Sequence, residues 1–251
     1  MLCQIRFSTI LRIRKDDEIV DFQEALRDRY PRYSKQQGMQ VLITPAGIQQ
    51  QETPDAQHRF DDTEGKFTVV LAPDFVALET TQYTDIEDFA TRIVELAQAV
   101  EDHFRPAEIL RIGMRFINEL RFKGAQPQDE MRAAINPTVL GAAGSDELLN
   151  VVASAQQVLD LSGDSSRILM RHGLNPSGTT VDPIGIRGPR PEWQHPFYLL
   201  DLDAFAEQAA PYDVAGVDAR VRDFNDDVRS LFAWAVQEAY RRDVLGQEDL
   251  T

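Results

Sequence analysis

The sequence predicts an α+β protein in which duplicated units of strand, helix, antiparallel meander and helix form one curved antiparallel sheet covered by helices on one face. Residues 108–122 (EILRIGMRFINELRF) alternate apolar and charged side chains, which is the pattern of a long half-buried strand. On each side of this strand the chain follows the same order of elements. A meander with one polar face leaves its other face to be covered by amphipathic helices.

The first half is expected over residues 1–105. A helical pattern there ends at Tyr30-Pro31, because the residue before a proline is disfavoured in a helix. Thr84 and Glu87 have the spacing of a capping box, so a long helix is expected to begin at Thr84. In order, we expect a strand at 2–8, a helix at 16–29, a strand at 40–44, a loop at 49–57 with Pro54, strands at 58–61, 66–71 and 75–82, and the long helix up to Pro106.

The second half is expected over residues 106–251, and both halves are expected to belong to one structural domain. It begins with the long strand and ends with a helix whose inner stripe includes Val221, Phe224 and Val228. Between them we expect a helix at 128–135 and strands at 149–160, 167–172 and 195–201, with the last helix at 217–242. This order is the plan of TATA-binding-protein-like folds, and a helix-grip arrangement is the alternative; both create a concave sheet face.

The charge of the chain bears on the class of partner. The 251 residues carry a net charge of −15, with 41 acidic and 26 basic side chains, and residues 52–102 contribute thirteen acids against three bases. Nucleic-acid binding normally needs a basic surface, so DNA or RNA is not expected as the main partner. An acidic surface can attract a basic protein, or it can serve solubility alone.

Targeting and redox signals are few. No apolar run approaches the ~20 residues that a membrane-spanning helix requires, and the N-terminus lacks the cleavage site of a signal peptide. We therefore expect a cytoplasmic protein. The single cysteine, Cys3, lies in an apolar strand pattern, where a small buried thiol is expected rather than a catalytic one.

The long strand carries the first candidate site. Arg111, Arg115, Glu119 and Arg121 share one face, where they could line a concave anion-binding surface. The alternative is that they pair with carboxylates on neighbouring strands and set the register. Asn118 is the polar member of the apolar face, and it is either a buried hydrogen-bonding post or a ligand contact.

Other candidate residues have less specific patterns. The histidines His58, His103, His172 and His195 show no metal-ligand spacing, so neither a metal nor a cofactor is expected. Asp201 and Asp203 precede an expected helix start; they could cap it or form ion pairs, with acid/base work or metal binding as alternatives. The Gly- and Pro-rich segment 175–191 is expected to be a surface loop, in which Arg187 and Arg190 could recognise a partner. Trp234 is expected in the core.

Several blocks also resemble one family of sporadically distributed bacterial proteins. They are CQIRFS, FQEALRDRYPRY, VLAPDFVALETTQYTDIEDF, FYLLDLDAFAE and, as the most specific, residues 111–118 (RIGMRFIN). The resemblance covers nearly the whole chain. The patchy distribution of the family implies mobile or defence-type genes rather than core metabolism, and it implies no activity and no catalytic residues.

Two functional hypotheses follow from the sequence. The first is a non-catalytic interaction or regulatory protein, of a defence or toxin–antitoxin type, whose acidic surface engages a basic protein partner. The second is a small-anion or nucleotide-binding concave sheet, as a sensor or an enzyme, that uses the Arg111/Arg115 strand face. The first is favoured because no catalytic constellation is evident. A homo-oligomer is left open, and no membrane partner is expected.

Overall fold

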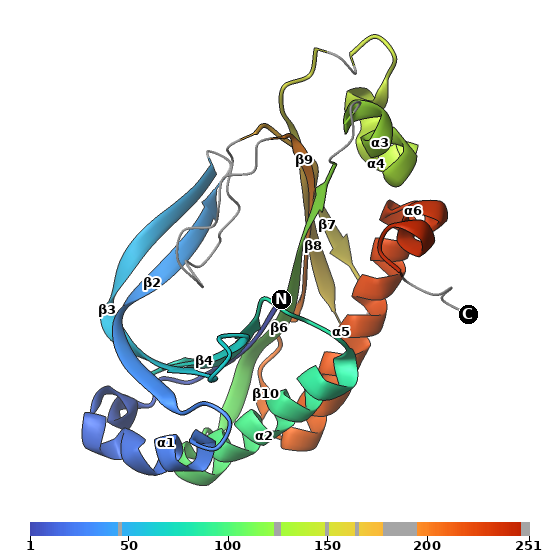
Figure 1. Ribbon diagram of the computed structural model, residues 1–251. Helices are drawn as coiled ribbons and strands as arrows, with labels where there is room; N and C mark the ends of the chain where they lie inside the picture. Colours follow the sequence, from blue (N-terminus) through green and yellow to red (C-terminus); the bar gives the residue numbers. More distant parts are fainter. Residues whose placement is uncertain (45–46, 123–126, 149–150, 164–165, 178–194, 247–251) are drawn as a thin grey trace. The chain divides into compact units, whose positions relative to one another are not determined.

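The protein is an α+β protein with one large antiparallel sheet of ten strands, against which the helices α2 (Ile86–Phe104) and α5 (Val214–Ala235) pack (Figure 1). The computed structural model describes residues 1–44, 47–122, 127–148, 151–163, 166–177 and 195–246, and of these it describes only the backbone for 38–44, 47–54 and 127. The architecture below refers to this part of the chain.

The strand order is β2-β3-β4-β5-β1-β6-β9-β8-β7, and the short β10 pairs with β6. The strands are β1 (Leu2–Phe7), β2 (Arg32–Thr44), β3 (Gly47–Asp61), β4 (Phe67–Ala72), β5 (Phe75–Thr80), β6 (Glu108–Arg121), β7 (Ala155–Ser162), β8 (Arg167–Asn175), β9 (Phe197–Ala206) and β10 (Ala210–Pro211). The shorter helices are η1 (Leu11–Arg14), η2 (Asp16–Ile19), α1 (Val20–Leu26), α3 (Pro127–Ala134), α4 (Pro137–Leu140), η3 (Gly141–Gly144) and α6 (Glu238–Asp243).

The described chain forms two compact units. Unit 1 contains residues 1–115 and 205–225, and unit 2 contains residues 116–177, 195–204 and 226–246. The strand β6 and the helix α5 each contribute to both units. Each unit is therefore described by itself.

Strand β1 lies at the centre of unit 1, between β5 and β6. Its buried face carries Cys3, Ile5 and Phe7, which are exposed by at most 1%. Opposite them on β6 lie Met114, Ile112 and Ile109. This alternation of buried and less buried residues follows from the twofold period of a strand.

Strand β6 contains a β-bulge at Leu110, so its side chains do not alternate throughout as the sequence pattern predicted. Arg6 pairs with Arg111 and Phe7 with Ile109, so Leu110 is the extra residue. The bulge interrupts the alternation and places Ile109 on the buried face. Ile109 is accordingly 8% exposed and Leu110 is 40% exposed, although the sequence pattern assigned Leu110 to the apolar face.

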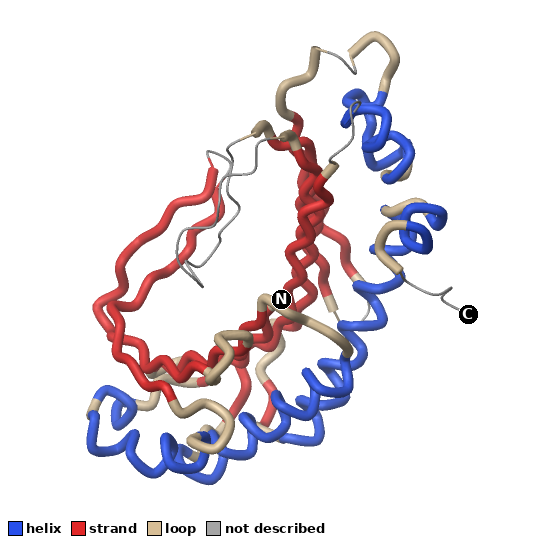
Figure 2. The backbone as a smooth tube through the Cα atoms, viewed as in Figure 1, coloured by secondary structure: helices blue, strands red, loops and turns tan. Residues whose placement is uncertain are grey.

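Helices α1 and α2 lie along one side of the strands of unit 1 (Figure 2). The apolar stripe of α2, with Phe89, Ile93, Leu96 and Val100, is buried as its helical spacing predicts. Its N-cap is Asp85, whose side chain accepts a hydrogen bond from the Asp88 backbone N–H. The expected Thr84 and Glu87 capping box is therefore wrong by one residue, because Asp85 occupies the N-cap position with an equally suitable side chain.

The hairpin of β2 and β3 replaces the loop that was expected at residues 49–57. Its pairing runs from Arg32 opposite Asp61 to Thr44 opposite Gly47, and only residues 58–61 of β3 also pair with β4. The two strands continue past β4 (Figure 1). The register shifts between Gln37 and Met39, where three residues of β3 that include Pro54 lie between consecutive partners. Such an irregularity accommodates a proline, which has no N–H to give to a ladder.

Unit 2 contains the β7–β8 hairpin and most of β9. Strand β9 continues to Ala206, so Asp201 and Asp203 lie within a strand and the expected helix start there is wrong. The last expected helix is divided, because residues 134–136 exchange backbone hydrogen bonds with residues 235 and 237 at the end of α5. Trp234 is 45% exposed, so the expectation that it lies in the core is wrong.

Gly173 lies where the β8 backbone approaches β7 most closely. Its φ is +155°, and a Cβ added there would lie 1.9 Å from the Ala155 carbonyl oxygen. No side chain fits at this distance, and the conformation itself favours glycine.

We expect Gly173→Ala to lower the free energy of unfolding by more than about 3 kcal/mol, because the β7–β8 pairing must separate to admit the methyl group. Chemical denaturation followed by circular dichroism measures this change. Gly246→Ala is the matched control, since Gly246 also has a positive φ (+66°) but nothing lies within 4 Å of its Cβ position. Equal stability of the two variants would contradict the steric argument.

Candidate functional site

The strand face of unit 1 opposite the β1 core side carries an ionic cluster of Arg59, Asp61, Thr68 and Glu79. Strand register places Asp61 next to Thr68 and Thr68 next to Glu79. Arg59 Nε lies 3.6 Å from an Asp61 carboxylate oxygen, and an Arg59 terminal nitrogen lies 3.9 Å from a Glu79 carboxylate oxygen. Arg59 also donates to the Thr68 hydroxyl at 3.3 Å. The one guanidinium therefore offsets part of the charge of the two carboxylates within this cluster.

Arg111 lies on the same face of unit 1, where its guanidinium has Glu207, Phe205 and Gly113 among its neighbours. Its Nε lies 3.6 Å from a Glu207 carboxylate oxygen, and its central carbon lies 4.7 Å from the centre of the Phe205 ring. Gly113 leaves room for it, because a Cβ there would lie 2.7 Å from an Arg111 nitrogen. The ion pair is of the kind considered as the structural alternative for Arg111, and the cation–π contact was not predicted.

Arg115 is the second arginine of the expected anion-binding face in unit 1. It pairs with Leu2 across the strands and is 8% exposed. A buried guanidinium is normally held by hydrogen bonds or ion pairs rather than left for solvent. The low exposure therefore favours a structural role over an open anion site.

Glu119 and Arg121, on the part of β6 that belongs to unit 2, pair with each other. Arg121 Nε donates to a Glu119 carboxylate oxygen at 3.0 Å. Asn118 donates its side-chain N–H to the carbonyl oxygen of Leu200 on strand β9 at 3.1 Å. The pairing of Glu119 with Arg121 lies within β6 and not between neighbouring strands, as the structural alternative had it, whereas Asn118 forms the hydrogen bond expected of a structural residue.

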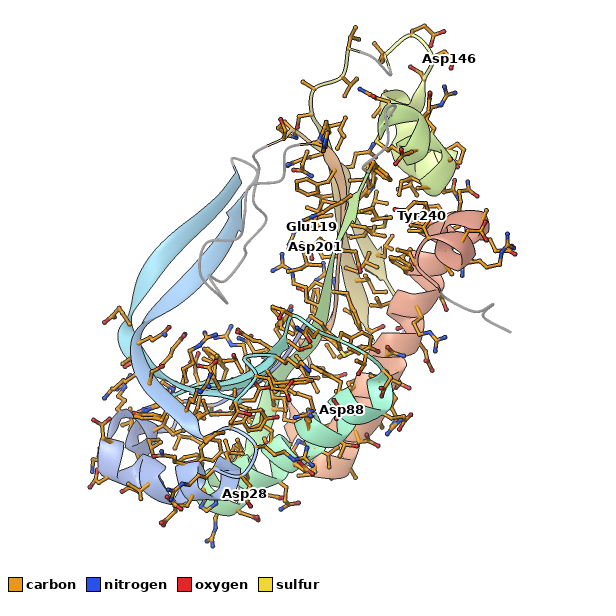
Figure 3. The ribbon with its side chains drawn as sticks, viewed as in Figure 1. Asp28, Asp88, Glu119, Asp146, Asp201 and Tyr240 are labelled. Carbon is orange, nitrogen blue, oxygen red and sulfur yellow. The ribbon has the colours of Figure 1, made fainter. Side chains whose placement is uncertain are left out.

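Asp201 of unit 2, which Figure 3 labels on β9, forms a buried ion pair. Its carboxylate lies 3.0 Å from an Arg171 nitrogen on β8, and the two side chains are 3% and 14% exposed. Ion pairing, one of the roles considered for Asp201, is therefore its observed role. Removing one partner of such a buried pair strongly destabilises the folded protein, because the other charge stays buried without compensation.

Two buried histidines bond tyrosine hydroxyls. In unit 1, His58 Nε2 lies 3.0 Å from the Ile13 carbonyl oxygen and so donates to it, which leaves Nδ1 to accept from the Tyr33 hydroxyl. In unit 2, the Tyr198 hydroxyl donates to the Val139 carbonyl, so His172 Nδ1 donates to the Tyr198 oxygen. Burial lowers the pKa of both histidines and so favours their neutral forms.

The remaining candidates within the described residues form no reactive centre. Arg187 and Arg190 lie outside the described residues. Cys3 is fully buried, and burial raises the pKa of its thiol to about 12, which disfavours the nucleophilic thiolate. Within the described residues, no three His, Cys, Asp or Glu side chains gather as a metal site would require. No helix of the described chain is long and apolar enough to cross a membrane.

The ionic cluster around Arg59 was not predicted from the sequence. Its charged members occupy alternate positions of expected strands, as in Arg59 and Asp61 of β3. This alternation indicates a shared face, but it does not reveal that β3, β4 and β5 are neighbours in this register. The sequence alone did not reveal the order of the strands in the sheet, which was needed to predict this cluster.

Comparisons with protein-family models, with curated proteins and with solved structures found no match. The resemblance to the family of sporadically distributed bacterial proteins therefore stays a prediction.

We expect Asp201→Ala to lower the free energy of unfolding by about 3 to 5 kcal/mol, because it leaves the Arg171 charge buried without this carboxylate. The double variant Arg171→Met/Asp201→Leu should recover most of that loss, since it removes both charges and retains apolar volume. Urea denaturation of the three proteins measures both effects. A double variant no more stable than the single one would show that the pair itself, and not charge compensation, is required.

Stability should fall on acidification below about pH 6.5, because the unfolded chain protonates His58 and His172 more readily than the fold does. The contribution of these lowered pKa values is fully present above the unfolded value of 6.5 and is lost as pH falls through the folded values. Urea midpoints between about pH 7.5 and about pH 5 measure this slope, and His172→Phe should reduce it. A slope unchanged by His172→Phe would contradict the role of this histidine.

Proposed function

We propose that the protein is a non-catalytic interaction component that recognises a basic protein partner through an acidic surface of unit 1. The proposal rests on one observation, which is that the basic and the acidic side chains of the protein differ in whether they have partners. Arginines on the strand faces contact carboxylates or are buried, whereas most members of a row of exposed carboxylates on η2, on α1 and just after α1 have no basic partner in the described structure.

The row consists of Asp17, Asp21, Glu24 and Asp28, which we call the α1 acidic face. All four are exposed, and spacings of three or four residues place them on one side of the helical segment. Figure 3 labels Asp28 at the end of α1. Glu24 has a partner in Arg27, but in the described structure Asp17, Asp21 and Asp28 have no basic side chain within ion-pair distance. Like charges at this spacing destabilise a helix by roughly 0.2 to 0.5 kcal/mol per pair, which opposes the favourable effect of Asp17 and Asp21 in the first turns of η2 and α1.

A basic partner would gain from this surface. Complementary charge raises association rates and selects against acidic competitors, and the net charge of −15 extends the attraction beyond the helix itself. The family resemblance adds the biological setting, a regulatory component of a defence or toxin–antitoxin type. In that setting, masking a basic protein requires a surface and no catalytic residues.

The anion-binding alternative has weaker support. Arg111 already contacts Glu207 and Phe205, and Arg115 is buried. An anion at this face would have to displace these contacts before it gained its own. The contacts support structural roles for both arginines.

The finer fold assignment belongs to the same proposal. The strand order supports a duplicated, curved sheet of the TATA-binding-protein-like or helix-grip-like kind. In the sheet, β1 lies next to β5, the last strand of the meander β2-β3-β4-β5, and β6 lies next to β9, the last strand of the meander β7-β8-β9. In each case the first strand of the sequence repeat pairs beside the last strand of its meander. A duplicated fold does not by itself define a function.

The test is an affinity capture of the tagged protein from its native cells, with quantitative mass spectrometry. We expect a basic partner at a stoichiometric level, and we expect Asp17→Asn/Asp21→Asn/Asp28→Asn to reduce its capture at least about tenfold, with a similar reduction of wild-type capture at high salt.

The matched control is Asp129→Asn/Glu147→Gln/Asp223→Asn, which removes the same charge from exposed positions elsewhere. It should retain wild-type capture. Equal capture by both triple variants would exclude the α1 acidic face, and the absence of any partner would favour the anion-binding alternative.

A further inference from the structure

The edge strand β7 of unit 2 is exposed along its whole length. No strand of the described residues pairs with its outer side, because the strand order ends there. Seven of its eight residues are exposed, and three of them are large apolar residues, Val158 (60%), Leu159 (37%) and Leu161 (36%). Exposed apolar edges of this kind readily pair with another strand.

The outward hydrogen-bonding groups of β7 follow from its register with β8. Gly163 N–H donates to the Ser166 carbonyl at 2.8 Å, so this pair belongs to the hydrogen-bonded class. Hydrogen-bonded and non-hydrogen-bonded pairs alternate along an antiparallel ladder, which directs the backbone groups of odd-numbered residues toward β8. Gln156, Val158, Asp160 and Ser162 therefore direct their N–H and C=O groups outward.

This outward set is symmetric about Leu159. An antiparallel strand centred there pairs Val158 with Asp160 and Gln156 with Ser162, and each pair occurs twice across a twofold axis. Leu159 then lies opposite Leu159, and Leu161 lies opposite Gln157. We propose that β7 pairs with β7 of a second copy of this chain, antiparallel and centred on Leu159, so that the sheet continues from one subunit into the other.

The local charge permits this pairing. Asp160 is the one charged residue of β7, and Arg167 of β8 forms an ion pair with it. In the twofold arrangement Asp160 lies opposite Val158, so like charges do not meet. The other edge of the described sheet differs, since β2 carries Arg32 and Lys35, and basic residues on an edge oppose such pairing.

The proposed register can be tested by light scattering and by disulfide cross-linking of the purified protein. Light scattering over a concentration series should show a mass approaching twice the 28.4 kDa of one chain. Leu159→Cys should form an intermolecular disulfide on mild oxidation, because two residues opposite each other in a non-hydrogen-bonded pair have Cα atoms about 4.5 Å apart. The native Cys3 is buried and gives little background.

Val158→Cys is the matched control. Val158 is more exposed than Leu159, so random collisions would favour disulfide formation at this position. In the proposed register two copies of residue 158 have Cα atoms more than about 7 Å apart, and they should form at least about tenfold less disulfide.

A wild-type protein that stays monomeric at every concentration overturns the proposal. Equal or greater cross-linking of Val158→Cys overturns the register even if a dimer exists. Thermal melts of both variants exclude unfolding as the cause. Neither outcome depends on the basic partner of unit 1, because no other protein is present in these measurements.

Discussion

The pairing of β1 with β6 is the interaction on which the rest of unit 1 depends. Six residues at the start of the chain lie between β5 and β6, and their buried face meets residues more than 100 positions later. Bringing such distant segments together costs chain entropy, which the burial of Cys3, Ile5 and Phe7 helps to offset. The apolar stripe of α2 and the pairing of β10 with β6 both require this central arrangement.

Regular periodicity is what made much of the fold predictable. The twofold alternation of β6 and the helical stripe of α2 identify their elements, because one side of each is buried. The errors fall where another segment decides the outcome. The bulge at Leu110 depends on how β1 pairs, and the polar stretch 49–57 becomes a strand because β2 supplies its hydrogen-bonding partner. Local composition contains neither fact.

The candidate site was predictable in its residues but not in their contacts. Arg111 could be selected because it shares a strand face with other charged residues, and Asp201 because it lies two residues from Asp203. Their partners, Glu207 and Arg171, are separated from them by 96 and 30 positions, and only the folded sheet brings them together. The same holds for Arg59 and Glu79, whose proximity depends on the order of three neighbouring strands. A sequence lists charges, whereas compensation is a property of the fold.

The two units are interleaved along the chain, and this affects how the protein is made. Unit 1 includes residues 205–225, so its sheet lacks β10 and its helix layer lacks Val217, Val221 and Phe224 until most of the chain has been synthesised. An N-terminal half emerging from the ribosome therefore holds the unfinished core of unit 1, with apolar surface that later residues must cover. Domains that are continuous in sequence can fold as they emerge, whereas unit 1 of this chain cannot be completed until residues 205–225 have been synthesised.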